Sequence, residues 1–249
     1  MNPCKFCNQE KPLIEAHIIP RWAYMYLYPT DEVKRKPLVI VHSKRDKISQ
    51  IGLYDSQILC RDCDSFLGQY DKFGKEVLLD GAPESATDKG EIAYTIKNVD
   101  TQRLRIFLLS VLWRCSISKR EELKHINLGP YEQKILNLLS KLKADGKIEA
   151  EIEDFPMIIT KFGGGDFPEV VDKNIQMPMT IRFKDDGINC QVLYFPKGIK
   201  IYIKTDKRKF AEALAKFQLN GTEIVVPKMR NFQDSEEFEF MVKAVHKKL

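Results

Sequence analysis

Four cysteines in two closely spaced pairs constrain this chain more than any other feature. Cys4 and Cys7 form one C-x-x-C pair near the start, and Cys60 and Cys63 form a second one. A two-residue turn brings both sulfurs of a pair to about 2.3 Å from a single ion, so two such pairs supply the four thiolates of a tetrahedral zinc site. The spacing therefore predicts one structural Zn²⁺ that is shared by both pairs and fastens together two distant segments.

Two other uses of the cysteine pairs stay open. A thioredoxin-like redox motif needs one C-x-x-C that opens a helix after a strand, and it leaves the second pair unexplained. Two disulfides are the other alternative, but disulfides are typical of secreted chains. No charged segment followed by an apolar core and a cleavage site stands at the N-terminus, so we expect an intracellular protein. Cys115 and Cys190 lie outside the motif and resemble ordinary small core residues.

The chain has 249 residues and a hydrophobic content of 43%, which is enough for one large domain or two small ones. We expect two, divided at the turn-rich stretch 80–90. The predicted fold class is α+β, with an N-terminal zinc-stabilised module at 1–84 and a mixed α+β domain at 91–249. No stretch reaches the uninterrupted apolar length of a membrane span, so we expect a soluble, cytoplasmic protein without a membrane partner.

The net charge is a mild basic excess of +5 that is unevenly distributed. Residues 1–90 contain thirteen Lys/Arg and thirteen Asp/Glu, so the whole excess comes from residues 91–249. Two basic clusters nevertheless lie between the cysteine pairs, at 34–36 and 44–47. Such clusters either neutralise the phosphates of a nucleic acid or form a solvated loop face. The charge is compatible with a polyanionic partner without requiring one.

The spacing of apolar residues predicts both helices and strands. Apolar residues recur at three- and four-residue intervals after Asp64 and through 101–118, which indicates two helices, the second of them buried. In that second helix Arg114 is expected to reach a carboxylate, with a nucleic-acid contact as the alternative. Gly163, Gly164 and Gly165 lack the Lys-Ser/Thr of a P-loop and predict a turn. Further helices are expected at 21–28, 131–142, 209–217 and 235–247, and strands at 37–42, 51–59, 158–160, 179–183, 191–195, 199–203 and 222–226.

The order of motifs around the cysteines resembles the HNH endonuclease family in its cysteine-knuckle, ββα-metal variant, and it looks like a bacterial branch of that family. The elements that carry the resemblance are Cys4 and Cys7, the run His17-Ile18-Ile19-Pro20, and the knuckle Leu59-Cys60-Arg61-Asp62-Cys63-Asp64. The match covers the N-terminal module only. It implies a structural zinc and a separate catalytic Mg²⁺ or Mn²⁺, because a four-thiolate zinc has no open position for water.

The resemblance also implies roles for four residues. His17 matches the general base that takes a proton from water, a task that suits an imidazole titrating near neutrality. Asp64 replaces the usual His after the second knuckle and is an acceptable oxygen ligand for Mg²⁺, while Asp71 follows on the same helical face. Asp55 takes the place of the Asn that orients the base. Ala16 departs from the family, since an acidic or His ligand usually precedes the base.

Three of these residues have a structural alternative as well. His17 is alternatively a packed, hydrogen-bonded histidine, Asp64 a helix N-cap, and Asp71 an ion-paired surface residue. The leading hypothesis is a metal-dependent endonuclease that hydrolyses phosphodiester bonds in DNA, whose C-terminal domain supplies substrate choice or a surface for a protein partner. The rival hypothesis is a non-catalytic zinc module that binds nucleic acid or protein, or that is purely structural.

Overall fold

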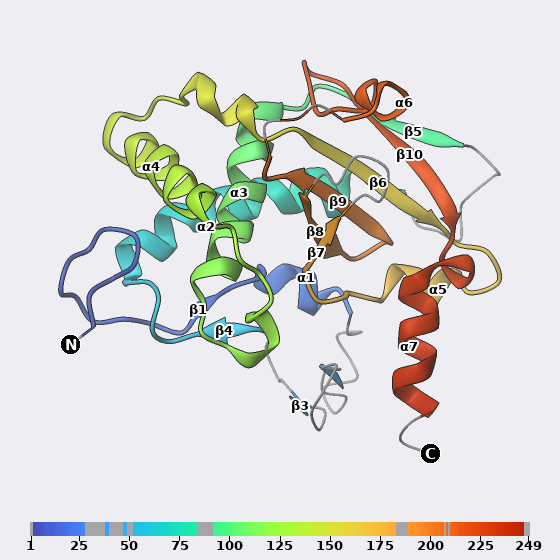
Figure 1. Ribbon diagram of the computed structural model, residues 1–249, viewed down its shortest axis with the longest axis horizontal. Coiled ribbons are helices and arrows are strands. Elements are labelled where there is room, and N and C mark those ends of the chain that lie inside the picture. The colour runs from blue at the N-terminus through green and yellow to red at the C-terminus, as the bar shows by residue number, and fades with distance from the viewer. Residues whose placement is uncertain are drawn as a thin grey trace.

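The computed structural model describes residues 2–27, 38–39, 47–48, 52–83, 92–182, 189–206, 208 and 210–246. Within these ranges the chain is a mixed α+β protein, as the sequence predicts. Figure 1 shows a sheet near the middle of the molecule with helices on both sides of it. Of the predicted linker 80–90, residues 84–90 lie outside the described residues. So do the basic cluster at 34–36 and the cluster at 44–47, except for Lys47 in a short strand.

Six strands form one mixed sheet, in the order β5-β10-β6-β9-β8-β7. They span Ala93–Ile96 (β5), Met157–Gly163 (β6), Met179–Arg182 (β7), Asn189–Phe195 (β8), Ile199–Lys204 (β9) and Ile224–Asn231 (β10). Neighbouring strands are antiparallel except for β6 and β10, which run parallel. The turn from β8 to β9 contains Lys197 and Gly198, both at the positive φ angles that hairpin turns require.

Helices make up most of the remaining described structure. The α-helices span Arg21–Met25 (α1), Arg61–Lys75 (α2), Thr101–Ile117 (α3), Pro130–Asp145 (α4), Pro168–Asp172 (α5), Glu212–Ala215 (α6) and Glu236–His246 (α7). Short helical turns of other types span Glu76–Asp80 (η1), Glu121–Leu123 (η3), Ala150–Asp154 (η4) and Phe232–Asp234 (η5).

Local sequence signals explain where the helices α3 and α4 begin and where α4 ends. Helix α3 begins where the Asp100 side chain accepts a hydrogen bond from the backbone N–H of Arg103 at 2.9 Å, which caps the helix. Helix α4 begins with Pro130, whose fixed φ suits a first helical position. It ends at Gly146, which takes the left-handed conformation at φ 66°. These signals are local, so the sequence alone predicts both helices.

Side chains cover both faces of the central strands. On one face Leu193 and Ile201 belong to the main core, together with Leu108 of α3. On the other face Val192 and Tyr194 pack in a second cluster with residues of η5 and α7. Figure 1 shows α3 on one side of the sheet and α5 and α7 on the other. Consequently β6 and β8 are buried over nearly their whole length.

The described part of the N-terminal module contains, besides α1 and α2, only short strands and the turn η1. Strand β1 (Ala16–His17) pairs antiparallel with β4 (Tyr54–Asp55), and β2 (Leu38–Val39) pairs antiparallel with β3 (Lys47–Ile48). Helix α2 begins at Arg61, directly after Cys60, so Cys63 lies within the helix. Each described strand here is two residues long, so hydrogen-bonded pairing alone cannot stabilise the module.

Most of the helices and strands predicted for residues 91–249 are confirmed, but they begin and end at other residues than predicted. The buried helix through 101–118 is α3, and the expected strand at 158–160 extends over all of β6. The helix expected at 209–217 is only the four residues of α6, and strand β5 was missed because Ala-Tyr-Thr-Ile is too short to give a pattern. Of the glycine run, Gly163 ends β6 and Gly165 lies in a turn at φ 53°.

One hydrophobic core runs through both predicted domains. It contains Ile18 and Leu67 of the N-terminal module together with Leu108 of α3 and Phe195 of β8. The ring of Trp22 stacks on Phe195 at a centroid distance of 5.5 Å. The separability of 1–84 from 91–249 stays a prediction, and any separation would expose these side chains. None of the helices in the described ranges is long and apolar enough to span a membrane.

Candidate metal centre and the adjoining polar cluster

The two cysteine pairs meet at one place in the fold. The sulfurs of Cys4, Cys7, Cys60 and Cys63 all lie within 4.8 Å of one another, and the Sγ atoms of Cys7 and Cys60 are 3.9 Å apart. Zinc–thiolate bonds of about 2.3 Å in a tetrahedron imply sulfur–sulfur distances of about 3.8 Å. All six cysteines of the chain are described, and all are free thiols rather than disulfides. The four cysteines are therefore placed to hold one metal ion such as zinc.

Backbone hydrogen bonds hold the two pairs against each other. The N–H of Lys5 donates to the carbonyl of Ile58 at 2.8 Å, and the N–H of Cys60 donates to the Sγ of Cys4 at 3.3 Å. Cys60 is the N-cap of α2 and Cys63 lies in its first turn. The partial positive charge at a helix N-terminus favours thiolates there. Thiolate ligands also match the soft-ligand preference of Zn²⁺, and four of them leave no open coordination position.

A lysine from the second half of the chain reaches the cysteine group. Lys143 of α4 donates from Nζ to the Sγ of Cys63 at 3.1 Å. Its ammonium also lies 5.4 Å from the ring centroid of Phe6 and 5.7 Å from that of Phe66. Burial raises the pKa of the Cys63 thiol, and the hydrogen bond from Lys143 opposes that shift. No local pattern in the sequence indicates this contact, because the two residues are 80 positions apart.

His17 and Asp64 lie close enough to interact electrostatically. Burial raises the pKa of the Asp64 carboxyl above its ordinary value, and the positive charges of Arg114 and His17 oppose this shift while Asp71 adds to it. The N-cap alternative for Asp64 is wrong, because Cys60 occupies that position and the N–H of Asp64 donates to its carbonyl at 3.0 Å. Asp64 is thus a half-buried carboxyl group inside the first turns of α2.

Arg114 joins three elements around this group. Its guanidinium is 1% exposed and makes two hydrogen bonds to the carboxylate of Asp71, at 2.6 and 2.9 Å. The same guanidinium donates to the backbone carbonyl of His17 at 2.9 Å. The expectation that Arg114 reaches a carboxylate is therefore confirmed. The alternative prediction that Asp71 is an ion-paired residue is also confirmed, although the pair with Arg114 is largely buried and not on the surface.

Asp55 is placed away from the side chain of His17. In the β1–β4 pair Asp55 stands opposite Ala16, and His17 stands opposite Tyr54, so the side chains of Asp55 and His17 project to opposite faces. The Asp55 carboxylate accepts hydrogen bonds from the N–H of Gln57 at 2.8 Å and from the Oγ of Ser118 at 2.7 Å. Asp55 thus fastens the turn after β4 to the end of α3. Of the four predicted site residues, Asp71 and the backbone of His17 bond to Arg114, and Asp64 interacts with Arg114 electrostatically.

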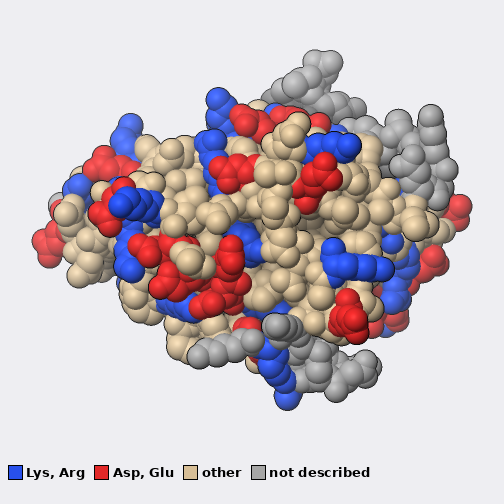
Figure 2. Space-filling model, turned by 90° about the horizontal axis from the view of Figure 1, so that it is seen from above, with Lys and Arg blue, Asp and Glu red and all other residues tan. Residues whose placement is uncertain are grey.

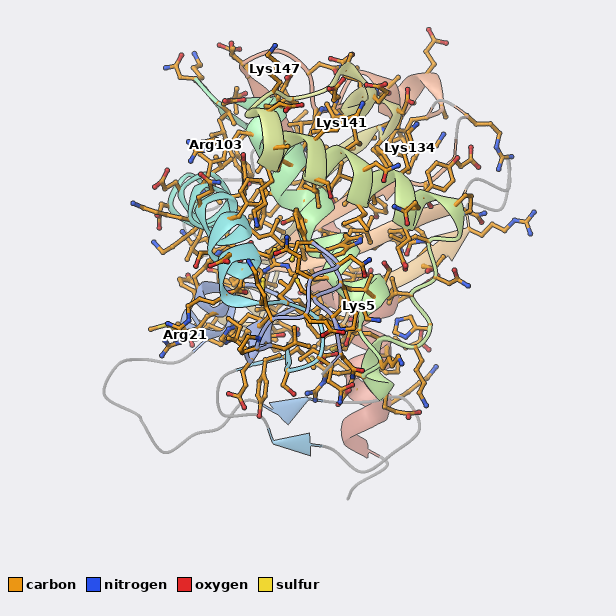
Figure 3. All side chains as sticks on the ribbon, turned by 90° about the vertical axis from the view of Figure 1, so that its left-hand side faces the viewer. Lys5, Arg21, Arg103, Lys134, Lys141 and Lys147 are labelled. Atoms are coloured by element: carbon orange, nitrogen blue, oxygen red, sulfur yellow. The ribbon has the colours of Figure 1, made fainter. Side chains whose placement is uncertain are left out.

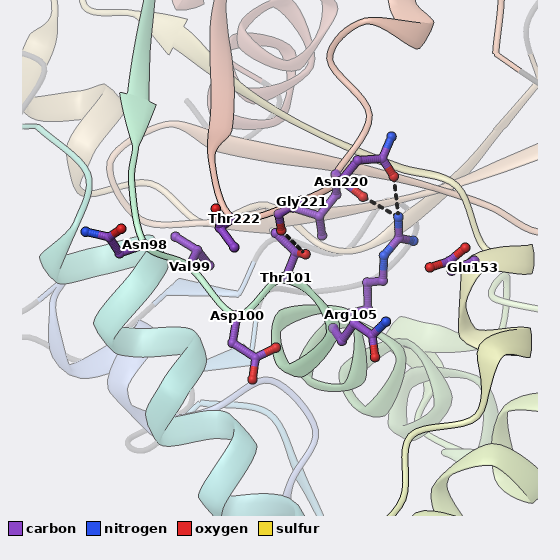
Figure 4. Close-up of a pocket in the computed structure, with 11 residues that line it drawn as sticks. Asn98, Val99, Asp100, Thr101, Arg105, Glu153, Asn220, Gly221 and Thr222 are labelled. Carbon is purple, nitrogen blue, oxygen red and sulfur yellow. Dashed lines mark hydrogen bonds between the residues drawn. The ribbon is translucent and has the colours of Figure 1, made fainter.

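A separate cleft of about 630 Å³ lies at the start of α3. Figure 4 shows Arg105 reaching into it beside Asn220, with Glu153 across from the guanidinium. Arg105 donates to the carbonyl of Phe155 at 2.9 Å, to the carbonyl of Leu219, and to the Oδ1 of Asn220 at 3.3 Å. Arg105 therefore ties α3 to the end of η4 and to the turn before β10.

Cations on the surface are dispersed and often paired with acids. Figure 3 labels six of them on the side that carries α2 and α4: Lys5, Arg21, Arg103, Lys134, Lys141 and Lys147. Lys134 pairs with Asp154, and Lys141 lies 3.8 Å from Glu149. On the face seen in Figure 2, acidic and basic side chains lie next to each other. Among the described residues on these faces, cations lie singly among acids and form no continuous basic patch.

No protein-family model, no curated protein and no solved structure matches this chain. A fold by itself does not define a function, because one fold carries many unrelated activities. The function therefore has to be argued from the cysteine group, the His17–Asp64 pair and the contacts around them.

Proposed function

We propose that this chain is a metal-dependent endonuclease of the HNH type that hydrolyses phosphodiester bonds in DNA. The observation that carries the proposal is the interaction between His17 on the β1–β4 pair and the half-buried Asp64 of α2, next to four cysteines that can hold a structural zinc. A candidate base on β1 and a candidate oxygen ligand on α2 thus interact electrostatically, and α2 begins at the second cysteine pair. Free thiols are typical of reducing compartments, which agrees with a cytoplasmic protein.

The chain's own residues would divide the work as follows. The imidazole of His17 takes a proton from the attacking water, a step that a positioned base accelerates by about 10²- to 10⁴-fold. The carboxylate of Asp64 supplies an oxygen ligand, and its raised pKa reflects a half-buried acid that gains from a neighbouring cation. A divalent ion such as Mg²⁺ or Mn²⁺ would supply charge stabilisation at the phosphate. Arg114 holds Asp71 and the backbone of His17 in place.

The test is a plasmid-nicking assay with Mg²⁺ and Mn²⁺ on zinc-loaded protein. His17→Ala should reduce cleavage by about 10²- to 10⁴-fold and leave zinc content and thermal stability near those of the parent, because it removes a base and no metal ligand. Asp64→Asn should also reduce cleavage, with partial rescue at higher divalent ion concentration. The matched control is His125→Ala, since the ring of His125 contacts the carbonyl of Pro178 at 2.7 Å in the second half of the chain.

Two results would defeat the nuclease proposal. One is a zinc-loaded parent protein that cuts neither single- nor double-stranded DNA with either cation. The other is a His17→Ala variant that cleaves as fast as the parent and the His125→Ala control.

A second candidate function is a non-catalytic zinc module that binds nucleic acid or a protein partner. One observation favours it: Arg114 already neutralises Asp71, and Ala16 offers no ligand before His17, so Asp64 is the main carboxylate left for a cation. DNA binding without cleavage, with an affinity that falls steeply as salt rises, would support this candidate. Absence of binding at low salt would leave a structural role or a protein partner for the C-terminal part.

A further inference from the structure

The environment of the four cysteines includes a cation that comes from outside the N-terminal module. Lys143 lies near the end of α4, and its Nζ donates to the Sγ of Cys63 at 3.1 Å. The ring centroids of Phe6, which lies between Cys4 and Cys7, and of Phe66, which lies three residues after Cys63, are 5.4 and 5.7 Å from the same ammonium. In Figure 1 the loop near the N-terminus lies beside α4 and the start of α2.

The charge of a four-thiolate centre gives this contact its importance. Four thiolates around one Zn²⁺ carry a net formal charge of minus two, and three of the cysteines are buried. A buried negative charge is stabilised when a cation hydrogen-bonds to it. Groups that hydrogen-bond to metal ligands also orient them and retain the metal. The aromatic rings favour a cation at this position as well.

A second cation lies near the cysteines but is differently engaged. Lys11 donates to the carboxylate of Asp62 at 2.9 Å, and both side chains are well exposed. Its charge is therefore balanced by a carboxylate and reduced by solvent. Lys143, in contrast, is half-buried and directs its ammonium at a cysteine sulfur.

We propose that Lys143 is a positioning residue of the metal centre, which balances thiolate charge through Cys63 and couples α4 to metal occupancy. Loss of the metal should then loosen the end of α4, although α4 supplies no ligand. This inference rests on the cysteine centre and does not depend on nuclease activity.

The packing of α4 makes such coupling physically reasonable. Leu139 and Leu142, on the turns around Lys143, are buried in the main core with residues of α3. The last residue of the helix, Asp145, is two residues after Lys143, and Gly146 caps the helix. The end of a helix has few backbone hydrogen bonds and frays easily, so one charged contact there has a measurable effect.

The experiment measures zinc release from the purified full-length protein to an excess of a chromogenic chelator. The test variant is Lys143→Met, which keeps the length of the side chain and removes its charge. Lys143→Arg keeps a cationic donor, and Lys141→Met is the matched control because Lys141 lies on the same helix and faces Glu149. Zinc content and thermal unfolding are recorded for each protein before release is started.

Removing a partner of a metal ligand typically lowers metal affinity about 10- to 100-fold, so we expect Lys143→Met to release zinc faster than the parent by up to about that factor. Lys141→Met should match the parent, and Lys143→Arg should fall between the parent and Lys143→Met. The proposal is overturned if Lys143→Met releases zinc at the parent rate, or if Lys141→Met accelerates release equally. A Lys143→Arg variant as fast as Lys143→Met, or a parent without zinc, also overturns it.

Hydrogen exchange tests the coupling to α4 separately. Chelation of the parent should accelerate exchange at residues 139–145, whereas in Lys143→Met these residues should exchange faster already with zinc bound. Exchange in α4 that does not respond to chelation of the parent would overturn the coupling.

Discussion

The N-terminal module and the six-stranded sheet contrast in the amount of regular structure that supports each of them. Strands β1 and β4 are two residues long, while β6 and β8 are seven residues long and buried on both faces. A sheet of that size is stabilised by the apolar area it removes from water. Two-residue strands cannot be stabilised in this way, so we expect the module to depend on metal at its cysteine centre and on packing against α3.

The two regions also use buried charge differently. In the module, Arg114 connects Asp71 to the backbone of His17, and Lys143 contacts Cys63, so both cations join the module to helices of the second half. On the outer face of the sheet, Lys200 and the hydroxyl of Tyr194 both bond to the Glu237 carboxylate, at 2.5 and 2.9 Å. Charged side chains thus connect the module to the helices α3 and α4 in the first case and fasten α7 to the sheet in the second.

The largest effect should follow from loss of a metal ligand. Structural zinc contributes about 10–16 kcal/mol in small zinc modules at neutral pH, as much as the whole stability of many domains. Cys60→Ser should therefore abolish zinc binding and give fast hydrogen exchange throughout α2 and the β1–β4 pair. Residues of β6 and β8 should stay protected longer.

Cys115→Ala is the control for this prediction, because Cys115 is buried in α3 away from the metal group. It should keep zinc. If α2 of Cys60→Ser exchanges hydrogen as slowly as α2 of the parent, the module does not depend on the metal, and the two regions do not differ in this respect.

The next largest effect should come from Arg114, which joins the module to α3. Arg114→Met leaves the Asp71 carboxylate and the His17 carbonyl without their buried donor, and breaking a buried pair in this way costs about 3–5 kcal/mol. Urea unfolding monitored by fluorescence measures the loss.

The double variant Arg114→Met with Asp71→Asn should be less destabilised than the sum of the two single changes, because the orphaned charge is removed. Additive losses would mean that the two side chains act independently.

A core truncation in the sheet should be smaller in effect and independent of metal. Ile201 is fully buried in β9, so Ile201→Ala should lower the free energy of unfolding by about 2–5 kcal/mol. The loss of unfolding free energy caused by Ile201→Ala should be the same in thermal unfolding with chelator and without it. A loss that changes with zinc would show that the sheet, too, depends on the metal centre.

The smallest effect concerns Glu237 and is tested by pH. Burial alone would raise the pKa of Glu237, but the charge and hydrogen bond of Lys200 and the bond from Tyr194 outweigh it and hold the pKa below its ordinary value. A carboxyl group whose pKa is lower in the folded than in the unfolded protein stabilises the fold at pH values above its unfolded pKa of about 4.3. This stabilisation is lost as the pH falls through the folded-state pKa.

Glu237→Gln should cost about 1.5–3 kcal/mol at neutral pH and remove this part of the acid dependence of stability. Urea unfolding between neutral and acid pH measures both. If the free energies of unfolding of parent and variant change in parallel with pH down to acid pH, Glu237 is not responsible for this acid dependence. The control is Lys243→Ala on the exposed face of α7.

Local chemistry let the sequence predict a good part of this protein. The C-x-x-C spacing by itself predicted that four cysteines share one site, because each pair is a two-residue turn and thiolates have few other uses in that arrangement. Apolar periodicity predicted α3 and the helix that starts after Cys60, because burial of one face needs only residues three and four apart. The mixed α+β class follows from the same patterns.

Tertiary structure decided which distant groups meet. Arg114 reaches Asp71 across 43 positions, Lys143 reaches Cys63 across 80, and Asp55 bonds to Ser118 across 63. Periodicity indicates which face of an element is buried but not which partner that face meets, because the partner depends on how α3 and α4 pack on the module. The face of β1 that carries His17 was decided by strand register, and the electrostatic interaction of His17 with Asp64 by the packing of α2, rather than by any local pattern.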